Sequence, residues 1–116
     1  MNAENLEVFK VGEFFYESEC GKVRSIRAVE VVDGSVLFLA HDIAKHVLGV
    51  SNPFSLTRSV DDRSKVELVL TFTEGQNPQR YILVDLEGLR CMVYRARSSE
   101  VNRLDFINWI KQKSVN

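Results

Sequence analysis

Short runs of apolar residues, separated by polar and turn-forming residues, dominate the first forty residues of the chain. Residues 6–11 (LEVFKV), 26–32 (IRAVEVV) and 35–39 (SVLFL) are rich in β-branched and aromatic side chains, which predicts three strands. The Asp33-Gly34 pair between the last two runs predicts a hairpin with a type I′ turn, because both central residues of that turn need positive φ. The first part of the chain is therefore expected to form antiparallel strands.

The pattern changes from strand-like runs to a helical period in residues 38–53 (FLAHDIAKHVLGVSNP). Apolar residues recur there at helical spacing at Ile43, Ala44, Val47 and Leu48. Asp42 is placed to cap this helix, and Gly49 is placed to end it in the left-handed conformation. Asn52 followed by Pro53 predicts the start of a second helix, with the asparagine as its cap. The segment therefore has the layout of a helix-turn-helix unit.

The second helix of this unit is predicted over residues 53–59. One of its two large apolar residues, Phe54 or Leu56, is expected to anchor it inside, while its polar residues stay largely outside. These polar residues are Ser55, Thr57 and Arg58. A helix-turn-helix unit places its second helix in the major groove of DNA, so the outer residues of this helix are candidates for contact with bases.

The second half of the chain repeats both patterns. Residues 66–73 (VELVLTFT) alternate between apolar and polar side chains, and residues 80–84 (RYILV) follow a turn-rich loop, which predicts a second hairpin. Asp85 is placed to cap a third helix, in which Gly88 either permits close packing or marks a later start. A last helix is predicted to open at residues 98–100 and to run through Ile110, with Lys111 and Lys113 in its last turn. The order predicts an α+β fold, in which a small antiparallel sheet with hairpins packs against about four short helices.

Length and charge add two expectations. The chain has 116 residues, of which 45% are hydrophobic, and this predicts a single domain, 1–116, that folds without a metal or a disulfide. Residues 1–21 contain five glutamates and one lysine, and residues 1–24 are interpreted as an acidic N-terminal strand plus an insertion. The C-terminal quarter is locally basic, a pattern that suits contact with phosphates or a solvated helix surface equally well.

Metal-binding, disulfide and membrane patterns are absent from the sequence. His41 and His46 are five positions apart, which on a helix separates them by about 140°, so the pair does not suit one metal ion. Cys20 and Cys91 are too few for a disulfide scaffold and are interpreted as reduced thiols. The N-terminus lacks the blocks of a signal peptide, and no apolar run approaches the ~18 residues of a membrane span. A cytoplasmic protein is therefore expected.

Catalytic motifs are likewise absent. The adjacent acids Asp61 and Asp62 lie in a charged connector, where such residues usually face solvent or cap a turn. The sequence contains no GxSxG, P-loop or GxGxxG motif. We therefore do not expect an enzyme, and no cofactor is predicted.

Eight short segments, spread over almost the whole chain, follow one another at nearly the spacing of a known family. They are residues 6–9, 26–29, 37–44, 48–53, 60–62, 87–89 and 95–98, and the pair Phe106 and Trp109. In this order they resemble the Bro-N domain, which is found at the N-terminus of baculovirus Bro proteins and of many phage antirepressor-type proteins. The likeness is most visible in LFLAHDIA, which resembles the family's WFVAKDVA, and in LGVSNP, which resembles its LGYSNP.

The chain also departs from the family pattern. Leu37 replaces an aromatic residue, and His41 replaces a lysine that suits contact with phosphate. Residues 12–24 look like an acidic insertion between the first two strands, and Phe106 lies about two residues later than the family pattern places it.

The resemblance implies a Bro-N-like fold and a viral or prophage regulator that binds DNA and controls transcription in the host-cell cytoplasm. The second helix would then present Asn52, Ser55 and Arg58 to the bases, because asparagine suits adenine and arginine suits guanine. Arg95 and Arg97 would contact phosphates. A role of Asn52 only as a cap, and of Arg58 only as a solvated side chain, stays open.

A protein-binding function is the alternative. Phage antirepressors occupy a repressor rather than DNA, and the small size, the near-zero net charge and the acidic N-terminal segment suit that function. The partner would then be a repressor or another DNA-binding protein. A structural or assembly role without nucleic acid and a homodimer are both compatible with the sequence.

Overall fold

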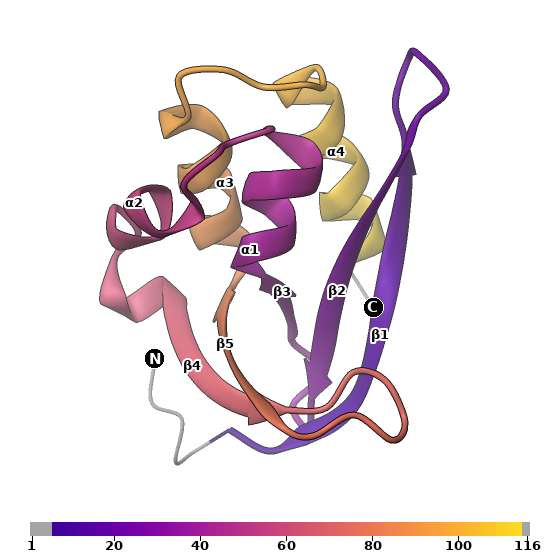
Figure 1. Cartoon of the computed structure of the whole chain (residues 1–116), viewed down its shortest axis with the longest axis vertical. Helices are drawn as coiled ribbons and strands as arrows, with labels where there is room; N and C mark the ends of the chain where they lie inside the picture. The colour runs from indigo at the N-terminus through magenta and orange to yellow at the C-terminus, as the bar shows by residue number, and fades with distance from the viewer. Residues whose placement is uncertain (1–5, 115–116) are drawn as a thin grey trace.

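The computed structural model describes residues 6–114. Its five strands form one antiparallel sheet in the order β1-β2-β3-β5-β4. The strands are β1 (Val8–Glu17), β2 (Val23–Val31), β3 (Val36–Leu39), β4 (Lys65–Leu70) and β5 (Gln79–Val84). The helical elements are α1 (Ala40–Asp42), η2 (Ile43–Val47), α2 (Pro53–Arg58), η3 (Asp62–Ser64), α3 (Leu86–Arg95) and α4 (Arg103–Lys113). This confirms the predicted α+β class (Figure 1).

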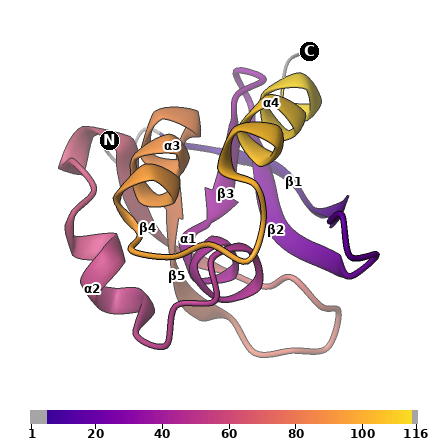
Figure 2. The ribbon, with the colours of Figure 1, turned by 90° about the horizontal axis from the view of Figure 1, so that it is seen from above.

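The sheet has an apolar cluster on each face, because neighbouring residues of a strand point to opposite sides. One cluster lies under the helices and contains Ala28 and Phe38 together with Phe106 of α4. The other lies on the opposite face and contains Val29 and Leu37. The helices gather on one side of the sheet, as the views in Figures 1 and 2 both show.

The first hairpin is longer than expected. Residues 12–24 were expected to hold an acidic insertion, but β1 continues to Glu17 and pairs with β2 as far as Glu17 opposite Val23. The extra residues therefore lengthen a two-stranded ribbon, whose turn projects beyond the rest of the sheet in Figure 1. The cause is the alternation of this segment, which buries Phe14 and Tyr16 toward the helices.

The hairpin predicted at Asp33-Gly34 is confirmed between β2 and β3, but its turn is not of type I′. Gly34 has a φ of 93°, whereas no residue other than glycine has positive φ within the described part of the chain. The Gly34 N–H donates to the Val31 carbonyl, and the Val31 N–H donates to the Ser35 carbonyl. The loop is therefore the three-residue kind with a left-handed glycine, in which Asp33 needs no positive φ.

The prediction that Asp42 caps the first helix is wrong. The helix begins at Ala40, and the Asp42 side chain makes no cap hydrogen bond. It is 1% exposed and instead accepts three hydrogen bonds from Arg27 of β2. The end of the helix is as expected, because Gly49 adopts a φ of 70° after a turn of π-helix.

The short helix α2 confirms some expectations and corrects others. Pro53 occupies its first turn, but the Asn52 side chain makes no cap hydrogen bond. Leu56 is the buried anchor, whereas Phe54 is 67% exposed. Thr57 was expected outside but is buried, because its hydroxyl donates to the Pro53 carbonyl and so needs no water.

The second half of the chain follows the prediction with shifted boundaries. Strand β4 ends at Leu70 rather than at residue 73. The Asp85 carboxylate accepts from the Gly88 N–H and caps α3 as expected. Gly88 permits close packing, because a β-carbon there would lie 2.8 Å from the Ser64 carbonyl oxygen.

Helix α4 begins at Arg103 rather than at residue 98. The Asn102 side chain accepts from the Asp105 N–H and provides the cap, and Val101 before it is buried in the same cluster as Phe106. The preceding loop is tied to the sheet by an ion pair between Glu100 and the buried Arg24 of β2.

Candidate functional site

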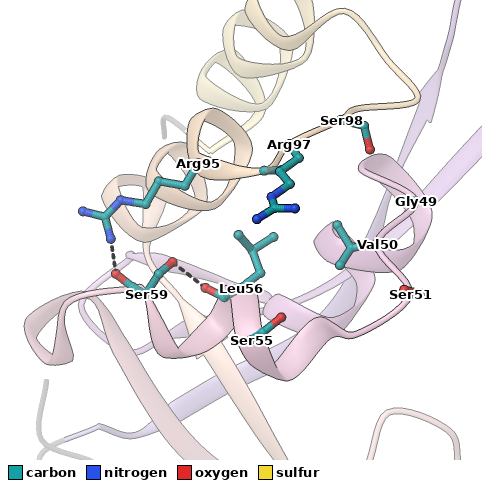
Figure 3. Close-up of a pocket in the computed structure, with 10 residues that line it drawn as sticks. Gly49, Val50, Ser51, Ser55, Leu56, Ser59, Arg95, Arg97 and Ser98 are labelled. Carbon is teal, nitrogen blue, oxygen red and sulfur yellow. Dashed lines mark hydrogen bonds between the residues drawn. The ribbon is translucent and has the colours of Figure 1, made fainter.

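A cavity of about 630 Å³ lies between α2 and the end of α3, and it brings together three of the five predicted site residues. Ser55 lines it from α2, Arg95 from the last turn of α3, and Arg97 from the loop that follows (Figure 3). The other two predicted residues, Asn52 and Arg58, belong to the same helix region but do not line the cavity.

The lining has an uneven chemical composition. It contains two arginines and four serines but no carboxylate, and its remaining residues are apolar or glycine. The serines are Ser51, Ser55, Ser59 and Ser98. Guanidinium groups and hydroxyls donate hydrogen bonds to phosphate oxygens. A carboxylate in the lining would repel a phosphate, because both are negatively charged. The cavity is therefore suited to an anion.

The two arginines differ in what holds them. A terminal nitrogen of Arg95 donates to the carbonyl of Ser59, the residue that ends α2, so Arg95 also fastens α3 to that helix. Arg97 extends toward Leu56 and Ser55 across the cavity (Figure 3). Within residues 6–114 no hydrogen bond or ion pair holds the Arg97 guanidinium, so it is the side chain that is free to bind a ligand.

The remaining predicted residues lie on the exposed surface of α2. Arg58 is exposed in the last turn of the helix. Asn52 is exposed before the first turn, and its carbonyl accepts from the Ser55 hydroxyl at 3.0 Å. The hydroxyl oxygen of Ser55 can still accept a hydrogen bond from a ligand. The helix has only six residues, so it can present about one and a half turns to a surface.

Three lining serines, Ser51, Ser59 and Ser98, were not among the predicted site residues. Ser59 follows Ser55 by four positions, a spacing that places both on one helix face, and this signal could have identified it. Ser98 lies in the loop after α3 and reaches the cavity because that loop passes the end of the first helix, beside Gly49 (Figure 3). No local pattern in the sequence marks it.

Asp61, shortly after α2, has a structural role. Asp61 accepts from the Arg63 N–H at 2.8 Å and caps η3, and the Arg63 side chain also donates to it. These bonds to Arg63 lower the pKa of Asp61 to about 2. A carboxylate that is this acidic does not suit a general acid at neutral pH. The expectation that this pair faces solvent or caps a turn is confirmed for Asp61.

A second groove, of about 380 Å³, lies on the other side of α2, against β5. The exposed Phe54 and the side chains of His41, Arg80 and Tyr81 contribute to it. Arg27 also contributes, but its guanidinium is committed to Asp42. Helix α2 therefore separates a cationic, hydroxyl-rich cavity from an aromatic groove.

No group of three or more potential metal ligands exists within the part of the chain that the structure describes. His46 directs Nδ1 to the Ser25 carbonyl at 2.6 Å, while His41 lies beside the aromatic groove. Cys20 and Cys91 are both free thiols. None of the described helices is long and apolar enough to span a bilayer.

Comparison with known proteins yields no match to this chain. No protein-family model matches it, no curated protein does, and no solved structure does.

Proposed function

We propose that this chain is a viral or prophage regulatory protein with a Bro-N-like domain that binds double-stranded DNA. The cavity between α2 and α3 carries the proposal, because Arg97, Ser55 and Ser98 line it without a carboxylate among the lining residues. A phosphate of the DNA backbone is the ligand that this set of donors fits best.

The position of the cavity supports the same function. It lies beside α2, the second helix of the helix-turn-helix layout, which presents Ser55 and Arg58 on its exposed surface. A phosphate held by Arg97 would therefore place α2 against the adjacent groove of a duplex. Phosphate contacts fix the register of a protein on DNA, and the side chains of the inserted helix read the bases.

The first experiment is a titration of a fluorescent random duplex at several salt concentrations. Binding that weakens steeply as salt increases would support phosphate contacts, because each neutralised phosphate releases counterions. No binding at low salt would contradict the proposal.

Substitution of Arg97 by alanine is expected to weaken binding to all duplexes by a similar factor. The slope of log affinity against log salt should decrease by about one, because one phosphate contact is lost. Arg97→Lys should keep the slope, since it keeps the charge. Arg90→Ala is the matched control, because Arg90 is an exposed arginine of α3 that pairs with Glu87 and does not line the cavity. An equal loss in the Arg90 variant would contradict a specific role for Arg97.

Substitution of Arg58 by alanine is expected to have a different effect. Discrimination between a selected site and random DNA should decrease by about 1–3 kcal/mol, because a bidentate contact to guanine is lost. The salt slope should change little. The measurement is competition between the two duplexes at fixed salt. A uniform loss on both duplexes would assign Arg58 to the phosphates instead.

An antirepressor-type protein-binding module is the alternative function. One observation favours it: Glu13, Glu17 and Glu19 are exposed on or next to β1, the strand at one edge of the sheet. Such a surface is complementary to the basic face of a repressor or another DNA-binding protein. This function predicts that the same titration shows no salt-dependent binding to duplexes.

A further inference from the structure

Strand β1 ends the sheet on one side, and within residues 6–114 only β2 is paired with it. It is ten residues long, which exceeds the usual length of an edge strand in a soluble protein. In Figure 1 the upper part of β1 has no other described segment on its outer side. The backbone along this side is therefore open to pairing.

The hydrogen bonds of the ribbon show which groups face outward. The Ser18 N–H donates to the Lys22 carbonyl at 3.0 Å, so this pair is hydrogen-bonded at the turn. Hydrogen-bonded and non-hydrogen-bonded pairs alternate along an antiparallel ladder. The N–H and C=O groups of Val11, Glu13 and Phe15 are then the ones directed away from β2.

The side chains along this edge combine apolar area with negative charge. Phe9, Val11 and Phe15 are 68%, 38% and 62% exposed. Glu13 lies between the last two on the same face of the strand, because side chains two positions apart share a face. The one cation of the strand, Lys10, is paired with Glu30 at 3.7 Å.

The charge indicates which kind of strand this edge accepts. A second copy would place acidic strands against each other, and like charges directly opposite destabilise a ladder. We propose that the outer edge of β1 binds an extended segment of another protein, with alternating basic and apolar side chains, as a sixth strand of the sheet. Backbone hydrogen bonds would provide the pairing, and lysine or arginine opposite Glu13 would provide the selectivity.

This inference does not depend on DNA binding, because the edge and the cavity beside α2 involve different elements. It supplies a geometry for the alternative, protein-binding function. Loss of DNA binding in the Arg97 variant and loss of strand binding at β1 would be measured on separate ligands, so one proposal can fail while the other holds.

The probe is an end-blocked peptide of alternating lysine and valine, added to the full chain at low salt. Hydrogen–deuterium exchange followed by NMR is expected to show slower exchange at the amides of Val11, Glu13 and Phe15 when the peptide is bound. The inward-facing amides of the same strand are already protected by β2 and should change little.

Two substitutions separate backbone pairing from charge. Val11→Pro removes one outward N–H and should weaken peptide binding about tenfold, whereas Val11→Thr keeps that N–H and should not. Glu13→Lys should slow association severalfold, and the matched control Glu87→Lys, on the exposed surface of α3, should not.

Three outcomes would overturn the proposal. The first is the absence of protection at the three outward amides, and the second is equal binding by a peptide of alternating glutamate and valine. The third is protection that develops without peptide as the protein concentration increases, which would identify a second copy as the occupant. Circular dichroism of each variant shows whether the sheet is intact.

Discussion

Asp42→Asn is expected to lower the free energy of unfolding by about 3 kcal/mol, because it removes the negative partner of an ion pair and leaves the positive partner, Arg27, in place. The Asp42 carboxylate accepts from the backbone N–H, Nε and a terminal nitrogen of Arg27 at 2.9, 2.9 and 3.0 Å. An asparagine keeps the size of the side chain, but its amide group would face one of these donors with another donor. The guanidinium of Arg27 would then keep its charge without its counterion.

The effect should extend beyond the pair. The Arg27 guanidinium also lies over the rings of Phe72 and Tyr81, 5.3 and 5.6 Å from their centroids. The carboxylate thus fixes a side chain that joins β2 to the loop after β4 and to β5. Loss of Asp42 is therefore expected to loosen this side of the aromatic groove as well as the start of the first helix.

Urea denaturation of the two proteins measures the change. Asp61→Asn is the matched control, because Asp61 receives a similar fork of hydrogen bonds from Arg63 at 3.1 and 3.0 Å but lies in solvent. Its denaturation midpoint should scarcely move. Equal midpoints for wild type and Asp42→Asn would refute the structural role given to this carboxylate.

Phe106→Ala is expected to cost about 3–5 kcal/mol, the usual range for removal of a buried aromatic side chain. Phe106 is fully buried, and its ring meets the Tyr16 ring edge-on at 5.3 Å and stacks with the Trp109 ring at 6.2 Å. These contacts join α4 to β1, so the cavity left by alanine would separate the helix from the ribbon. A domain of this size has about 5–15 kcal/mol of stability in total, so the variant would be near its limit.

Leu104→Ala on the same helix provides the control, because Leu104 is 59% exposed. It should change the unfolding midpoint little. Phe106→Leu is a milder variant that keeps most of the volume, and it should fall between alanine and wild type. If the alanine and leucine variants unfolded at the same midpoint as wild type, the assignment of Phe106 to the core would be wrong.

Local patterns in the sequence were sufficient for most of the elements. The β-branched and apolar runs at residues 26–32 and 35–39, with Asp33-Gly34 between them, predicted the hairpin of β2 and β3, and the helical spacing after residue 42 predicted the first helix. Asp85 capped α3, and Gly49 ended the first helix, because these residues act on their own neighbours. The resemblance to the Bro-N domain stays a prediction.

Errors arose where a side chain found a partner far along the chain. Asp42 is suited to cap a helix, yet Arg27 lies on the adjacent strand and offers three donors to it, which outweighs a single cap bond. Thr57 is an error of a different kind, because its partner is local: it is buried with its hydroxyl bonded to the Pro53 carbonyl four residues earlier. Neither partner is indicated by composition or period.

The candidate site shows the same division between sequence and tertiary structure. The sequence determined that Ser55 lies on the outer part of a short helix, and that Arg95 and Arg97 lie at the end of the third helix and just after it. Only the packing of α3 against α2 decided that these residues surround one cavity, and that Arg95 fastens the two helices while Arg97 is left free. The reason is that spacing along a chain fixes which face of an element a residue occupies, whereas contacts between elements depend on how their buried faces pack.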